Sequence, residues 1–187
     1  MTSISTPDIR PLRLAGAFEI TLRPIGDERG YFMTTYHAAL FRQHGMVTDW
    51  AQENQSLSAR KGILRGLHFQ LPPHTETKLV RVLSGAILDV MVDLRKASPT
   101  FGQWEAIELS AENRRMVYIP KGFAHGFCTL TDDVIVAYKV DAYYTPEAQA
   151  GLRWDDPTLA IRWPVQEPLL SPKDRALPDF ASFESPF

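Results

Sequence analysis

The sequence predicts an all-β protein, a jelly roll or a barrel, and three observations support this prediction. Short apolar segments recur at roughly 8–12-residue spacing, as in sandwiches and barrels. The 14 prolines and 11 glycines are spread between these segments, where turns belong. No helical segment alternates with the strands, which argues against a parallel α/β sheet. A barrel or jelly roll also offers a cavity inside the sheet.

Length and composition limit the possible classes of protein. The chain has 187 residues, 44% hydrophobic and 22% charged, which predicts one globular domain over residues 1–187. A net charge of −2 argues against a nucleic-acid surface and a polybasic membrane anchor. The single cysteine, Cys128, has no partner for an internal disulfide and fits a reducing compartment.

The chain shows no targeting segment. The start MTSISTPDIRPL lacks a basic region followed by an apolar run. No segment approaches the roughly 18 apolar residues of a membrane helix. We therefore expect a cytoplasmic protein.

In chain order, residues 1–35 are expected to be irregular or to form short strands, with a turn at residues 26–30. Residues 36–45, YHAALFRQHG, are the strongest helix candidate, and the helix is expected to end at Gly45. Strands are then predicted at 63–70, 78–83, 86–94, 104–109, 115–120, 126–130 and 134–144. The second and third are expected to pair as a hairpin around residues 84–85, and the fourth and fifth around residues 110–113. The last 40 residues predict an extended segment with a small helix near residues 172–174.

His68, in ILRGLHFQ, is the first residue that suggests chemistry. Strand alternation places it on one face with Gly66 and Gln70, and places Arg65, Leu67 and Phe69 on the other. Alone, such a histidine is often an ordinary core or surface residue.

Two further segments carry candidate residues. His125 lies in PKGFAHGF, which is either a tight turn with an exposed histidine or the wall of a pocket. Tyr138 shares a face with Val134, Val136 and Val140, and a buried hydroxyl in such a row needs a polar partner. A core tyrosine with one hydrogen bond is the simpler interpretation.

Taken together, the motifs resemble the dTDP-4-dehydrorhamnose 3,5-epimerase family over about residues 8–180. The segments that carry the resemblance are RGLHFQ, KLVRVLSGAILDVMVDLR, SPTFGQWEAIELSAENR, YIPKGFAHGF, YKVDAYYTPE and WDDP. The resemblance implies a cupin-like double-stranded β-helix, or jelly roll, with a short helix and an extended C-terminal segment. It also implies a homodimer, no metal and no cofactor, and a substrate in which a nucleotide diphosphate carries a 4-keto-6-deoxy sugar.

The resemblance also implies roles for individual residues. His68 corresponds to the catalytic base, Asp174 to its supporting carboxylate and Tyr138 to the acid on the opposite face of the sugar. Lys78 and His125 correspond to residues that line the pocket near the sugar, and Tyr144 is a further candidate there. The positions that hold the nucleotide diphosphate are Arg29, Gln52, Asn54 and Arg65. In the implied dimer, Arg29 and Thr34 face the neighbouring subunit's pocket.

These residue types suit the implied chemistry. A proton next to a ketone is removed only if the resulting enolate is stabilised, and a lysine such as Lys78 near the ketone oxygen supplies that stabilisation. Imidazole titrates near neutral pH, which suits His68 as a base. Inversion needs a second proton donor across the ring, a role for Tyr138. Arginine forks suit a diphosphate.

Three positions depart from the family pattern. Thr34 stands where the family has a glutamate that helps recognise the thymine base, Glu76 replaces a glutamine, and Gln149 replaces an acidic residue. Recognition of dTDP is the default, while a CDP- or GDP-linked sugar remains open. Epimerisation at C3 only or at C5 only also remains open.

Two other classes of function are retained as alternatives. In a metal-dependent cupin, His68, Glu76 and His125 would be ligands, although Gln70 stands where such proteins have a further histidine. A sugar-nucleotide-binding domain without catalysis is the other alternative. It is disfavoured because His68, Lys78, Tyr138 and Asp174 are all present.

Overall fold

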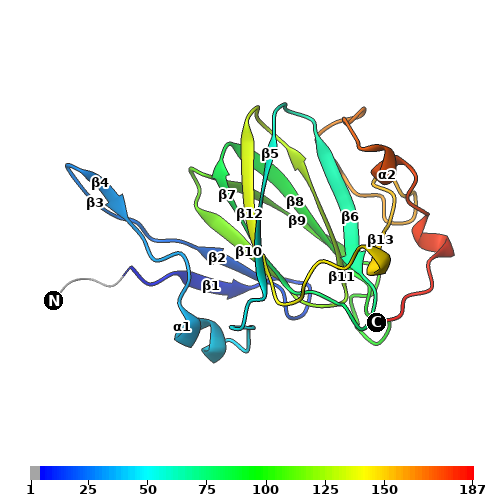
Figure 1. Ribbon diagram of the computed structural model, residues 1–187, viewed down its shortest axis with the longest axis horizontal. Coiled ribbons are helices and arrows are strands. Elements are labelled where there is room, and N and C mark those ends of the chain that lie inside the picture. Colours follow the sequence, from blue (N-terminus) through cyan, green and yellow to red (C-terminus); the bar gives the residue numbers. More distant parts are fainter. Residues whose placement is uncertain (1–4) are drawn as a thin grey trace.

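The computed structural model describes residues 5–187 and shows two antiparallel sheets that face one another (Figure 1). The six-stranded sheet has the order β1 (Asp8–Pro11), β2 (Phe18–Thr21), β10 (Arg115–Ile119), β7 (Lys78–Ser84), β12 (Val134–Val140), β5 (Gln52–Ser58). The five-stranded sheet has the order β13 (Gln149–Gly151), β6 (Leu64–Gln70), β11 (Phe123–Thr129), β8 (Ala86–Asp93), β9 (Trp104–Ser110). The predicted all-β jelly roll is confirmed. That residues 1–187 form one domain stays a prediction.

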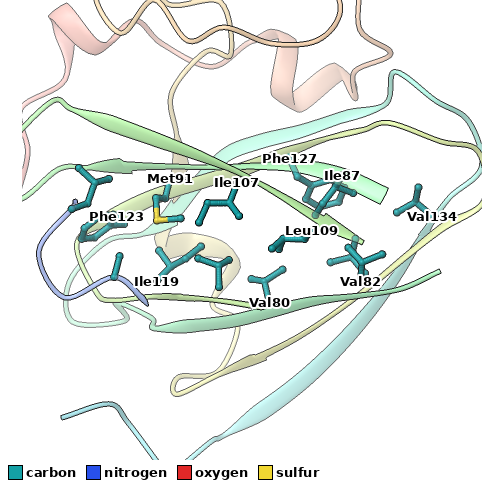
Figure 2. Packing of buried hydrophobic residues seen from close by; sticks show 14 residues of the cluster. Val80, Val82, Ile87, Met91, Ile107, Leu109, Ile119, Phe123, Phe127 and Val134 are labelled. Carbon is teal, nitrogen blue, oxygen red and sulfur yellow. The ribbon is translucent and has the colours of Figure 1, made fainter. Parts of the chain in front are cut away.

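The main core lies between the two sheets (Figure 2). Alternate residues of β7, such as Val80 and Val82, face Ile87 and Met91 of β8 across this core. Phe123 and Phe127 of β11 belong to the same cluster. Burial of these side chains is the main force that holds the sheets together, since apolar burial contributes about 25 cal/mol per Å².

The outer face of the five-stranded sheet is covered by the C-terminal segment. Leu152 and Leu159 are buried there, and Trp163, Phe183 and Phe187 pack against them. This segment also carries the short helix α2 (Pro172–Arg175), which the sequence predicted, and two 3₁₀ turns, η1 (Pro146–Ala148) and η2 (Phe180–Ser182). No helix among residues 5–187 has the length and apolarity needed to cross a membrane.

Helix α1 (Ala38–Gln43) packs on the other sheet, through buried Phe41. His37 caps its first turn, since Nδ1 accepts a hydrogen bond from the Leu40 backbone N–H at 3.2 Å. Gly45 follows the helix with φ of +71°, a conformation that favours glycine. The predicted helix and its end are confirmed.

The predicted turn at residues 26–30 joins β3 (Ile25–Asp27) to β4 (Gly30–Phe32) in a separate two-stranded hairpin. In Figure 1 this hairpin projects from the side of the molecule opposite α2. Tyr31 and Phe32 on it are 59% and 70% exposed. Large apolar side chains exposed together on a projecting arm are typical of a contact surface.

Both predicted hairpins are wrong. Strand β7 pairs with β10 and β12, whereas β8 pairs with β9 and β11, so residues 84–85 carry the chain from one sheet to the other. The same holds for residues 110–113, because β9 and β10 lie in different sheets. A tight turn between two apolar strands looks the same in sequence whether the strands pair or face each other across a core. Here the inward faces pack against one another, and the second arrangement results.

Smaller differences concern strand limits. Strands β5 and β13 were not predicted, β11 begins at Phe123 and not at residue 126, and β12 ends at Val140 and not at residue 144. β5 reads QENQSLS, which is too polar to resemble a strand by composition. The part of the prediction for residues 1–35 that concerns residues 1–4 lies outside the described residues.

A β-bulge in β6 changes which side chains face the core. His68 pairs with His125 and Arg65 pairs with Phe127, so three steps along β6 match two along β11. Arg65 and His68 therefore point into the same space between the sheets. The prediction that Arg65 points away from His68 is wrong, because simple alternation fails at a bulge.

Two glycines make this bulge possible. Gly66 has φ of +122°, and a Cβ there would lie 2.6 Å from the Gly126 Cα and 2.7 Å from the His125 carbonyl oxygen. A Cβ on Gly126 would lie 2.8 Å from the Arg65 carbonyl oxygen. The two backbones thus approach more closely than any larger residue allows.

We expect Gly66→Ala to lower the free energy of unfolding by ~2 kcal/mol or more, because the new methyl meets backbone and the positive φ is strained. The measurement is urea denaturation. Gly30→Ala is the control, since Gly30 has a similar φ of +127° with no atom within 4 Å of a built Cβ. Equal losses in the two variants would show that the contact between β6 and β11 is not what requires glycine at position 66.

Candidate active site

A cavity of about 550 Å³ opens between the two sheets and next to α2. Seven of the predicted site residues line it: Arg65, His68, Lys78, His125, Tyr138, Tyr144 and Asp174. They come from four strands, one loop and one helix that are far apart in the sequence. The fold therefore gathers into one space most of the residues that the sequence singled out.

His68 on β6 is bonded to Asp174 on α2. The His68 Nε2 and Asp174 Oδ1 atoms are 2.6 Å apart, and the side chains are 30% and 6% exposed. The α2 segment holds the carboxylate in place, because Ser171 Oγ accepts a hydrogen bond from the Asp174 backbone N–H at 3.1 Å. Burial by itself raises the pKa of Asp174, but the hydrogen bond and charge of His68 outweigh it and leave that pKa below its usual value.

Tyr138 and Lys78 face the cavity from the other sheet, on β12 and β7. Tyr138 also packs against the main core, as the valine row around it predicted. Burial raises the pKa of the Tyr138 hydroxyl, and the negative charge of Glu76 raises it further, against a smaller lowering by Arg65. The phenol is therefore held in its protonated form at neutral pH.

Lys78 is paired with Glu76, whose Oε1 lies 3.0 Å from Nζ. Both side chains are nearly buried, with 12% and 13% exposed. The other carboxylate oxygen of Glu76 accepts a hydrogen bond at 3.3 Å from Nε2 of Gln70, the last residue of β6. The two sheets are thus linked through polar side chains at this end of the cavity.

A second histidine–aspartate pair lies deeper. His125 Nε2 is 2.8 Å from Asp89 Oδ2, and Asp89 is completely buried on β8. Asp89 was not predicted as a site residue, although it interrupts the apolar run of residues 86–92. A carboxylate inside a buried strand needs a polar partner, so an aspartate in an apolar run could have been interpreted as a sign of a polar site. Of the two interpretations of PKGFAHGF, the pocket wall is the one that the structure supports.

Gln52 and Asn54 lie on the same face of β5 and line an adjoining part of the cavity with Tyr138 and Tyr144. Gln52 Nε2 donates to Asn54 Oδ1 at 2.6 Å. Arg65 is fixed at the rim by bonds to Ser58 Oγ and to the Leu57 carbonyl oxygen, both at 3.2 Å. The predicted nucleotide-binding residues Gln52, Asn54 and Arg65 are thus next to the His68 site.

Arg29 and Thr34 are not brought to this cavity. Arg29 lies in the turn of the β3–β4 hairpin, 85% exposed and paired with Asp27. Thr34 follows the same hairpin, and its backbone N–H donates to Ser5 Oγ at 3.4 Å. Within one chain, neither residue lines the space that contains His68.

Several cavity residues were not predicted as site residues. Lys173 lies next to Asp174 on α2, and Gln149 accepts a hydrogen bond from the Tyr144 hydroxyl at 2.6 Å. Ser56, Phe127 and Leu169 complete the wall. The position of Lys173 next to Asp174 in the sequence could have identified it as a site residue. Nothing in the sequence places Leu169 near the site, because only the tertiary structure brings it there.

The ligands that a metal-dependent cupin would use are engaged with other groups. Glu76 is paired with Lys78 and His125 with Asp89. An ammonium beside Glu76 opposes a second cation there. Among residues 5–187, no group of three or more His, Cys, Asp or Glu side chains is arranged to hold a metal ion.

The jelly roll and its cavity, with His68 on one wall and Lys78 and Tyr138 on the other, define the class of protein as an isomerase that acts on carbohydrates, as the family model and the relatives show. The family model described as dTDP-4-dehydrorhamnose 3,5-epimerase matches residues 11–182. The chain belongs to this family, as its sequence motifs predicted.

Individual relatives agree with the family assignment. The dTDP-4-dehydrorhamnose 3,5-epimerase of Shigella flexneri is 49% identical over 150 residues, 80% of this chain and 82% of the relative. The structure of the Bacillus anthracis enzyme with TDP and PPi bound has a TM-score of 0.91 and 48% identity, covering 93% of this chain and 99% of that one. A Legionella pneumophila 3,5-epimerase in complex with dTDP-4-keto-L-rhamnose has a TM-score of 0.90 and 42% identity, covering 96% and 95%.

We expect Asp174→Asn to destabilise the protein in a pH-dependent way. Because the folded-state pKa of Asp174 is lowered, its carboxylate stabilises the fold above the unfolded-state pKa of about 4, and this contribution disappears as pH falls through the folded-state value. The difference in unfolding free energy between wild type and variant is therefore constant from about pH 5 upward and shrinks below about pH 4. A difference that does not change with pH in urea titrations would contradict the assigned ion pair.

Proposed function

We propose that this enzyme inverts C3 and C5 of dTDP-4-dehydro-6-deoxy-glucose, in deoxysugar biosynthesis of the dTDP-L-rhamnose type. One observation carries the proposal: His68 and Tyr138 face the same cavity from opposite sheets, with Lys78 beside them. Inversion requires a base and an acid on opposite faces of one carbon. The names of the relatives, which are 3,5-epimerases of dTDP-linked sugars, agree with this chemistry.

In the proposed reaction His68 removes the proton from a carbon next to the C4 ketone. The Asp174 carboxylate is hydrogen-bonded to Nε2 of His68, so Nδ1 is the nitrogen that accepts the proton. The carboxylate then stabilises the imidazolium that forms. The electrons of the broken C–H bond form a carbon–carbon double bond, and the ketone oxygen becomes an enolate. The Lys78 ammonium stabilises that oxygen.

Tyr138 completes the inversion by giving its proton to the opposite face of the same carbon. The double bond returns to the ketone, and the product differs from the substrate only in configuration. The base then loses a proton and the phenol regains one, both by exchange with water. The raised pKa of Tyr138 favours this regain at neutral pH.

For the nucleotide diphosphate we propose Arg65, Gln52 and Asn54, which lie at the rim of the cavity. His125 and Tyr144 are proposed to contact the sugar. A guanidinium fork suits a diphosphate. The small negative net charge is consistent with such a ligand, since a local cationic rim is enough to bind it.

We also propose a homodimer in which the β3–β4 hairpin reaches a second copy. Its exposed Tyr31 and Phe32 supply an apolar contact, and Arg29 and Thr34 lie too far from the cavity of their own chain to serve it. In the dimer these two residues complete the neighbour's nucleotide site. A cytoplasmic location is proposed as well, supported by the buried free thiol of Cys128.

The test of the base is solvent deuterium exchange at C3 and C5 of the dTDP-linked 4-keto sugar, followed by mass spectrometry and NMR. We expect wild type to incorporate deuterium at both carbons and His68→Ala to lose at least about 100-fold of that rate. Exchange at one carbon only identifies a C3 or C5 mono-epimerase. Wild-type exchange in His68→Ala would overturn the assignment of the base.

Tyr138→Phe separates the acid from the base in the same assay. We expect it to slow epimerisation far more than it weakens substrate binding, because the proton donor acts only in the transition state. Equal losses in kcat and in affinity would make Tyr138 a binding residue.

The nucleotide is tested by calorimetric titration of dTDP, CDP and GDP side by side. We expect dTDP to bind about tenfold more tightly or better, in line with the discrimination that a shaped pocket supplies. Tighter binding of CDP or GDP would reassign the substrate, and Thr34 would be the residue to examine first.

A further inference from the structure

Glu76 is a carboxylate in the cavity that the proposed reaction does not use. It stands between two hydrogen-bond donors: Lys78 Nζ at 3.0 Å from one oxygen and Gln70 Nε2 at 3.3 Å from the other. A carboxylate accepts hydrogen bonds at both oxygens, whereas an amide presents one acceptor and one donor. In this chain both partners donate, and the carboxylate of Glu76 accepts a hydrogen bond from each of them.

Gln70 is itself firmly held. It is 3% exposed, and the two hydrogens of its Nε2 are shared among three acceptors: the carbonyl oxygens of His74 at 2.9 Å and Tyr143 at 3.2 Å, and Glu76 Oε2 at 3.3 Å. Its Oε1 accepts a hydrogen bond from the Thr145 backbone N–H at 2.7 Å. The amide orientation is fixed by these bonds, so Nε2 and not Oε1 faces Glu76.

We propose that Glu76 is a positioning residue for the epimerisation: its carboxylate, anchored by Gln70, holds the Lys78 ammonium in the cavity and places a negative charge near Tyr138. This inference rests on the proposed function, because Lys78 and Tyr138 act there on the enolate and on the returning proton. Without the anchor, the lysine chain has several rotatable bonds and no single direction.

The charge has a separate effect on Tyr138. Burial raises the pKa of the phenol most, and Glu76 adds to that rise while Arg65 opposes it. The other titratable or charged groups that line the same cavity are His68, Lys78, His125, Tyr144, Lys173 and Asp174. Removing the charge of Glu76 therefore lowers the pKa of Tyr138.

Glu76→Ala is the first test, because it removes both the negative charge and the group that accepts the hydrogen bond of Lys78. We expect kcat to fall about 10- to 100-fold, because a displaced catalytic group loses that order of rate, with a smaller change in KM. Titration of tyrosinate by ultraviolet absorbance, with Tyr138→Phe subtracted in each background, is expected to move to lower pH, because the negative charge that raises the pKa of Tyr138 is gone. Unchanged kcat together with an unchanged Tyr138 titration would overturn the proposal.

Glu76→Asp separates the effect of the charge from the effect of position, and it also serves if the alanine variant does not fold. The shorter side chain keeps the negative charge but does not reach both partners. We expect kcat to fall while the titration of Tyr138 stays near that of wild type. Wild-type kcat in this variant would show that Glu76 does not position Lys78.

Glu53→Ala is the matched control. Glu53 pairs with Lys139 at 2.6 Å on the same sheet, outside the cavity that contains His68, and we expect neither kcat nor the Tyr138 titration to change. The tyrosinate titration needs no substrate. If wild type fails to epimerise the dTDP sugar, the proposed function fails, while the titration still tests the coupling of Glu76 to Tyr138.

Discussion

The close approach of β6 and β11 at Gly66 and Gly126 is the constraint on which the site depends. A built Cβ at either glycine would meet the other strand's backbone within 3 Å, so only glycine permits the pairing. The pairing accommodates one extra residue in β6, and this turns Arg65 and His68 toward the same cavity. With regular alternation, the cation at the rim and the histidine would lie on opposite sides of the sheet.

The two sheets then contribute different chemistry to one space. The five-stranded sheet supplies His68 and His125, each bonded to an aspartate, while the six-stranded sheet supplies Lys78 and Tyr138. A hydrogen bond between the Gln70 amide and the Glu76 carboxylate connects the two walls. In the proposed reaction, a base and an acid on separate walls would act on the two sides of the sugar ring, as inversion requires.

Several charged side chains in this cavity are paired with groups of opposite charge, and the neighbouring groups determine the protonation states of Asp174 and Tyr138. Asp174 is kept ionised by its histidine partner, and Tyr138 is kept protonated by burial and by the nearby carboxylate. Most of the residues that line the cavity with His68 were predictable because RGLHFQ, KLVRV and IPKGFAHGF occur together in one order. Asp89 and Lys173 were missed, because in sequence one is a single charge in an apolar run and the other is a charged residue in a short predicted helix, where lysine is common.

The sequence by itself determined the class of fold, the helix at α1 and the residues of the His68 site, because these depend on local composition and on motifs that survive in order. Only the tertiary structure decided that β7 and β8, and likewise β9 and β10, lie in different sheets, and that Arg65 faces inward. A turn signal is local, but whether two strands pair or pack face to face depends on which apolar surfaces remain to be buried. The bulge likewise depends on the fit between two backbones that are 60 residues apart in the chain, and no periodicity within β6 encodes that fit.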